Sequence, residues 1–71
     1  MQANDNSKVY FVENTLVVET PNIETVSIYA LTGNLLFSGN KSEGSTSFGV
    51  SLASGAYIAK GSTGWTKKII K

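Results

Sequence analysis

The side chains that could perform chemistry in this chain are few and of a narrow kind. The 71 residues include no histidine, cysteine or arginine, so the usual neutral-pH base, the thiolate and the bidentate phosphate ligand are all missing. Catalysis requires a nucleophile, a base or a metal placed beside a partner. The many serines would need a lysine as their base, and the acids are scattered over tail, strand ends and loops, at Asp5, Glu13, Glu19, Glu24 and Glu43. We therefore expect no catalytic activity.

Two short segments superficially suggest ligand sites. Residues 4–6, Asn-Asp-Asn, offer oxygen ligands but lack the spacing and the closing glutamate of a calcium loop. The glycines at 61 and 64 lead into a strand pattern, with no helix N-terminus to hold a phosphate. We expect neither a metal nor another cofactor.

Charge and hydropathy exclude further classes of function. The net charge of +1 is too small for a nucleic-acid binder that is recognised by charge alone. Apolar runs extend over four or five residues, against the ~20 that a membrane helix needs, so we expect no direct membrane insertion. Residues 1–7 are rich in Asn, Gln and Ser, and they are expected to be a disordered linker or a leftover from excising the domain for expression.

The elements that would position these side chains are strands. Val, Ile, Thr and aromatic residues recur between turn residues spaced about every eight to ten positions, as in a sandwich or a barrel. A polar loop is expected at 39–45. The seven predicted strands are 8–13, 15–20, 25–31, 35–38, 46–52, 56–60 and 65–71.

Alternation along the strands predicts which residues face the core. Phe48, Val50 and Leu52 fall on one face of their strand and small polar residues on the other, which is typical of an antiparallel sheet with one wet face. Val26, Ile28 and Ile58 are also expected inward. Tyr29, Tyr57 and Trp65 are expected to be partly buried. Residues 8–71 are thus predicted to form one all-β domain, an immunoglobulin-like antiparallel β-sandwich of about seven short strands, with a small barrel as the alternative.

The segment 66–71, Thr-Lys-Lys-Ile-Ile-Lys, has two interpretations. Four of the six lysines lie in the last twelve residues of the sequence. Lysines on an edge strand prevent unwanted strand pairing. Alternatively, the segment is a basic docking strip, or an edge that a partner's strand extends.

Three segments in order resemble the C-terminal sorting domain of the type IX secretion system of Bacteroidetes (the Por secretion tail, type A). They are VSIYALTGNLLFSG, LASGAYIAKG and KKIIK, and the resemblance covers residues 9–71. Its recognition motif corresponds to Val26, Ile28, Tyr29, Gly33, Leu52, Gly55, Tyr57, Lys67, Lys68, Ile69, Ile70 and Lys71.

The resemblance implies an address label rather than an enzyme. Domains of this family sit at the C-terminus of a larger cargo protein, which first reaches the periplasm. Outer-membrane secretion machinery and a shuttle protein recognise the folded domain, and a surface sortase removes it. The cargo then remains at the cell surface or outer membrane, or becomes extracellular. The family fold is an immunoglobulin-like sandwich.

A structural or adhesive module of a cell-surface protein is the alternative function. In that case Tyr57 and Trp65 would stack on sugar rings, or the domain would bind another protein or space its neighbours. Packing of both rings in the core is the simpler expectation.

Overall fold

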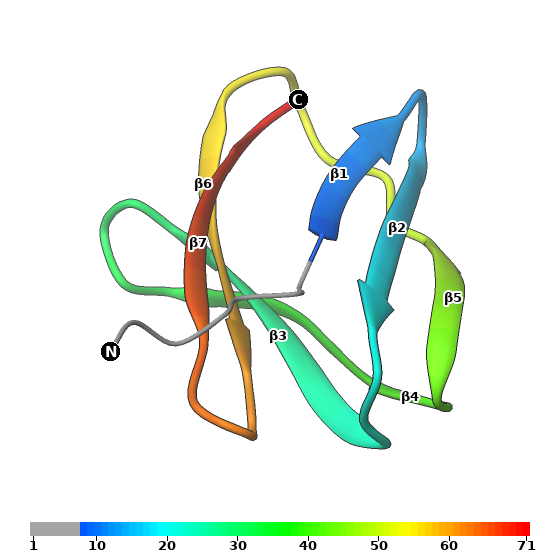
Figure 1. Ribbon diagram of the computed structural model, residues 1–71. Coiled ribbons are helices and arrows are strands. Elements are labelled where there is room, and N and C mark those ends of the chain that lie inside the picture. Colours follow the sequence, from blue (N-terminus) through cyan, green and yellow to red (C-terminus); the bar gives the residue numbers. More distant parts are fainter. Residues whose placement is uncertain (1–7) are drawn as a thin grey trace.

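The computed structural model describes residues 8–71, which form two antiparallel sheets packed face to face (Figure 1). One sheet has three strands in the order β1-β2-β5, and the other has four in the order β4-β3-β6-β7. The predicted β-sandwich is therefore confirmed. The predicted linker at 1–7 lies outside the described residues. The strands are β1 (Lys8–Val12), β2 (Thr15–Thr20), β3 (Glu24–Ala30), β4 (Leu35–Lys41), β5 (Gly44–Gly49), β6 (Ala56–Gly61) and β7 (Thr66–Ile70).

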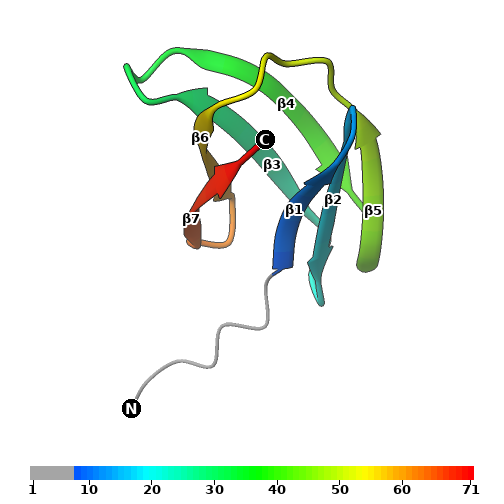
Figure 2. The same ribbon diagram turned by 90° about the horizontal axis from the view of Figure 1, so that it is seen from above.

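A single core fills the space between the two sheets, which Figure 2 shows from above. It forms because alternate residues of each strand point to the same face of a sheet. Seven partly buried apolar residues pack around it: Val9, Phe11, Phe37, Phe48, Leu52, Tyr57 and Trp65. The buried core residues are Leu16, Val18, Val26, Ile28, Val50, Ala59 and Ile69.

The predicted polar loop at 39–45 is wrong. β4 continues to Lys41 and β5 begins at Gly44, so only residues 42 and 43 turn the chain. Gly44 adopts a φ of 83°, which a side chain would disfavour. Lys41 is buried, and its ammonium donates to the carbonyl oxygens of Thr20, Asn22 and Ser42, although residues 42–45 around the turn are exposed. Hydrophobicity alone could not indicate the burial of Lys41.

The fifth strand is shorter than predicted, although its inward residues are right. It ends at Gly49, and the Val50 amide instead donates to the carbonyl oxygen of Asn14 in the β1–β2 turn. Val50 and Leu52 still reach the core. The remaining strand boundaries move by at most one residue from the predicted ones.

The inward placement of Ile58 is wrong. β6 pairs with β3 so that Ala59 lies opposite Ile28, and Ile58 lies opposite Tyr29. Since Ile28 and Ala59 are both fully buried, Ile58 must point to the outer face of the sheet. A shift of register by one residue reverses every side chain, and only the pairing partner decides between the two registers.

Replacement of Gly61 by alanine tests the packing at the end of β6. A Cβ atom there would overlap the indole ring of Trp65 and lie 2.5 Å from Oε1 of Glu24. Gly61→Ala should therefore lower the free energy of unfolding by about 1–3 kcal/mol, the usual cost of overpacking. Urea unfolding followed by circular dichroism measures the change.

Gly49→Ala is the matched control. Nothing lies within 4 Å of a Cβ atom at Gly49, so this variant should unfold close to the wild-type midpoint. Equal midpoints for Gly61→Ala and the wild type would contradict the packing described at Trp65.

Candidate functional site

The first segment of the predicted recognition motif is mainly structural. Val26 and Ile28 are fully buried. Gly33 sits in the β3–β4 turn at a φ of 98°, with its amide donating to the carbonyl oxygen of Ala30 at 2.9 Å. Tyr29 is different, because it points to the outer face, opposite Ile58. Of these four motif residues, only Tyr29 has its side chain on the outer face of the sheet.

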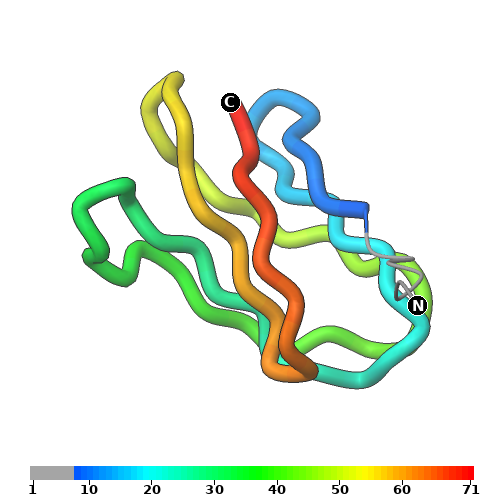
Figure 3. The backbone as a smooth tube through the Cα atoms, turned by 60° about the vertical axis from the view of Figure 1, so that its left-hand side comes forward, coloured from blue at the N-terminus to red at the C-terminus, as the bar shows by residue number. Residues whose placement is uncertain are grey.

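The second and third segments meet at one corner of the sandwich. The amide of Gly55 donates to the carbonyl oxygen of Lys71 at 3.0 Å, and the amide of Lys71 donates back to Gly55 at 2.8 Å. The ammonium of Lys71 donates to the carbonyl oxygen of Leu52 at 2.7 Å and to Oδ1 of Asn14 at 2.9 Å. We call Asn14, Leu52, Gly55 and Lys71 the terminal corner; Figure 3 shows the C-terminus beside the β1–β2 turn.

Tyr57 extends the terminal corner into the core. It pairs with Ile69 across β6 and β7, and its hydroxyl donates to the carbonyl oxygen of Ala53. Its ring meets that of Phe11 edge-on, with centroids 6.3 Å apart. The predicted motif residues Leu52, Gly55, Tyr57, Ile69 and Lys71 are thus brought together by the fold.

The remaining lysines and isoleucines of β7 face different sides. β7 is an edge strand of its sheet and contacts β1, which is an edge strand of the other sheet. Ile69 is buried, whereas Lys68 and Ile70 are exposed, Ile70 by 66%. Lys67 is partly buried. The strand therefore contributes one side to the core and leaves the side chains of Lys68 and Ile70 exposed.

A row of side chains crosses all four strands on the outer face of the larger sheet. Leu35 of β4, Tyr29 of β3, Ile58 of β6 and Lys68 of β7 lie opposite one another in turn. The ammonium of Lys60 lies 5.3 Å from the centre of the Tyr29 ring, within the range of a cation–π interaction. We refer to these five residues, with Ile70, as the outer face.

A buried polar cluster around Glu24 was not predicted from the sequence. One carboxylate oxygen accepts from the Thr20 hydroxyl at 2.6 Å. The other accepts from the Thr63 hydroxyl at 2.8 Å, from the Thr63 amide at 3.3 Å and from Nε1 of Trp65 at 2.9 Å. Thr20 is only four residues from Glu24, but Thr63 and Trp65 lie 39 and 41 residues away, so no local spacing could have linked them to it.

These hydrogen bonds control the charge of Glu24. Burial by itself would raise the pKa of the Glu24 carboxyl group. The hydrogen bonds from Thr20, Thr63 and Trp65 favour the ionised form, outweigh burial and hold the pKa below its ordinary value. The Glu24 carboxylate is therefore ionised and already accepts hydrogen bonds at both oxygens. It links β2, β3 and the β6–β7 turn and is poorly suited to transferring a proton.

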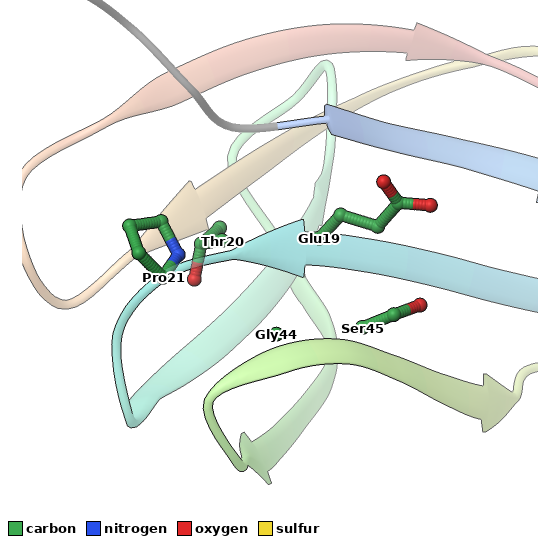
Figure 4. Close-up of a pocket in the computed structure, with 5 residues that line it drawn as sticks. All are labelled: Glu19, Thr20, Pro21, Gly44 and Ser45. Atoms are coloured by element: carbon green, nitrogen blue, oxygen red, sulfur yellow. The ribbon is translucent and has the colours of Figure 1, made fainter.

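Other features that could bind a ligand are modest. A shallow hollow lies where β2 ends and β5 begins, lined by Glu19, Thr20, Pro21, Gly44 and Ser45 (Figure 4). Within residues 8–71, no group of three or more acidic side chains is placed to hold a metal ion. The Asn-Asp-Asn segment at 4–6 lies outside the described residues.

No helix in the described part of the chain is long and apolar enough to cross a membrane.

Known proteins provide no relative on which to base an identification. Comparisons with models of protein families, with curated proteins and with solved structures gave no match. A function must therefore be inferred from the geometry of the terminal corner and the outer face, together with the motif resemblance.

Replacement of Glu24 by glutamine should make the free energy of unfolding vary less with pH in the acidic range. Because the pKa of Glu24 is lower in the folded state, its carboxylate stabilises the fold fully above the ordinary pKa of 4.5. That stabilisation is lost as pH falls through the folded-state pKa. We expect the variant to be less stable than the wild type by about 1–3 kcal/mol at pH 7. The difference should narrow toward pH 3, which urea unfolding at both pH values measures; an equal difference at both would contradict the assignment.

Lys71→Met should destabilise the terminal corner while keeping its backbone pairing. The variant loses the two ammonium hydrogen bonds to Leu52 and Asn14, which should cost about 1 kcal/mol of unfolding free energy. Lys68→Met is the matched control, since its exposed side chain should change stability by less than about 0.5 kcal/mol. Urea unfolding of the three proteins decides; equal losses in both variants would show that Lys71 is not a specific anchor.

Proposed function

We propose that this domain is a non-catalytic sorting signal that directs an attached cargo protein across the outer membrane by the type IX pathway. The terminal corner is the observation that carries the proposal. The second and third motif segments meet there, and Lys71 is tied down by both its backbone and its side chain. Order of this kind is what a partner would need in order to recognise the folded strand β7.

The partners implied are those of the pathway. Secretion machinery of the outer membrane and its shuttle protein would bind the folded domain, and a sortase would cut between it and the N-terminal cargo. The domain would thus pass through the periplasm, and the cargo would finish at the cell surface or in the medium. None of these steps asks the domain itself for a catalytic group.

A glycan-binding or adhesive module is less well supported by the geometry. Nε1 of Trp65 donates to the buried carboxylate of Glu24, and the ring of Tyr57 packs against Phe11. Sugar stacking requires an aromatic face that is open to solvent. Both rings singled out for that role are instead engaged within the sandwich.

A fusion experiment tests the proposal. The chain is attached to the C-terminus of a periplasm-directed fluorescent reporter in a bacterium with a working type IX system. We expect the reporter at the cell surface or in the medium, without the domain, and its intact mass locates the cut. A reporter that stays in the periplasm with the domain attached would overturn the proposal.

A deletion of residues 66–71 should abolish delivery in the same assay. Because this deletion also removes Ile69 from the core, the Lys71→Met variant accompanies it as a folded protein with a loosened terminal corner. Reduced delivery of Lys71→Met at a temperature where it remains folded would separate recognition from stability.

A further inference from the structure

The outer face of the four-stranded sheet is open, and it combines apolar side chains with positive charge. Tyr29 and Ile58 lie side by side on β3 and β6 and are partly buried. Leu35 and Ile70 flank them and are 56% and 66% exposed. An exposed aliphatic and aromatic surface of this kind, rimmed by charges, is a feature of protein interaction sites.

Only lysines charge this face among the described residues. Lys60 and Lys68 are both exposed. The described acids lie elsewhere: Glu13 in the β1–β2 turn, Glu19 on β2, Glu24 buried at the start of β3, and Glu43 in the β4–β5 turn. Although the net charge of the chain is close to zero, its charges are unevenly distributed. The described charged side chains on the outer face are all positive.

The two lysines are close enough for their charges to repel each other. Ile58 lies opposite Lys68, and Lys60 lies opposite Thr66, so Lys60 and Lys68 are diagonal neighbours on adjacent strands. Diagonal neighbours in an antiparallel pair are roughly 7–8 Å apart. Two like charges at that separation disfavour each other, and a carboxylate brought between them would relieve the repulsion.

Protection of the sheet edge does not explain Lys60. In the order β4-β3-β6-β7, β6 is an inner strand whose backbone is already paired on both sides. Gatekeeping lysines belong on edge strands, where unpaired backbone groups invite a foreign strand. Lys68 on β7 fits that role, but Lys60 does not. Lys60 instead lies over the Tyr29 ring, which places its charge directly beside the apolar centre of the face.

We propose that the outer face binds an acidic, partly apolar segment of a partner protein. Its carboxylates would bind Lys60 and Lys68, and one aliphatic or aromatic side chain would cover Tyr29 and Ile58. The inference rests on the proposed function, because the partner would be a component of the secretion apparatus. An anionic membrane is a poorer match, since lipid-binding segments use clusters of about four to eight basic residues.

The delivery assay tests the outer face with charge-matched variants. Lys60→Gln/Lys68→Gln removes two positive charges from the face. Ser47→Glu/Ser51→Glu lowers the net charge by the same amount at exposed positions outside it. We expect delivery of Lys60→Gln/Lys68→Gln, called the lysine variant below, to fall by about tenfold. That fall would correspond to about 1.4 kcal/mol of lost binding free energy. The serine variant and the charge-conserving Lys60→Arg/Lys68→Arg variant should be delivered nearly as well as the wild type.

The outcomes separate this inference from the proposed function. Delivery of the wild type and the lysine variant alike would overturn the inference and leave the sorting function standing. Equal loss in the lysine and serine variants would also overturn it, because net charge rather than the face would then matter. Circular dichroism melting of each purified variant shows that it is folded.

A binding measurement decides the case in which the wild type itself is not delivered. The probe is a synthetic six-residue peptide that alternates glutamate with leucine or tyrosine, titrated into the ¹⁵N-labelled full chain. Amide shifts concentrated on β3, β6 and β7, and lost in Lys60→Gln/Lys68→Gln, would support the face as a binding site. Shifts that are absent, or unchanged in that variant, would overturn it.

Discussion

The pairing of β3 with a strand on each side is the constraint on which the rest of the structure depends. β3 lies between β4 and β6, and its inward residues Val26 and Ile28 have no exposed surface. Once these two side chains are fixed in the core, alternation forces Tyr29 outward. Register then places Ala59 inward beside Ile28 and leaves Ile58 outside beside Tyr29. Core and outer face are therefore two consequences of one register.

The polar end of the sandwich depends on the same strand. Glu24 begins β3 and is 6% exposed, so its charge has lost most of its hydration. An unpartnered buried carboxylate would be strongly unfavourable. Donors from Thr20, Thr63 and Trp65 replace the lost water, and Lys41, opposite Glu24 on β4, is held by backbone carbonyl oxygens. A small domain without disulfides thus uses a saturated polar cluster to tie separate turns together.

The residues of the recognition motif divide between folding and surface. Most of them hold the fold together. The core contains Val26, Ile28, Tyr57 and Ile69, the β3–β4 turn contains Gly33, and Lys71 anchors the terminal corner. In the proposed function the partner would read a folded domain, so residues that only hold the fold would still be needed for recognition. Tyr29, Lys68 and Ile70 are left over for contact, and the structure adds Lys60 and Ile58 to them. The terminal corner keeps the last strand in place, and in the proposed recognition the outer face would provide the contacts to the partner.

The sequence by itself determined the class of fold and most of the strands. Period-two alternation and frequent turn residues are local properties, so seven short strands and the inward places of Val26, Ile28, Phe48, Val50 and Leu52 could be predicted. The tertiary structure alone decided the side taken by Ile58, the burial of Glu24 and Lys41, and the convergence of Leu52, Gly55 and Lys71. Each of these depends on partners many residues away, and a pattern along one strand does not specify which strand will lie beside it.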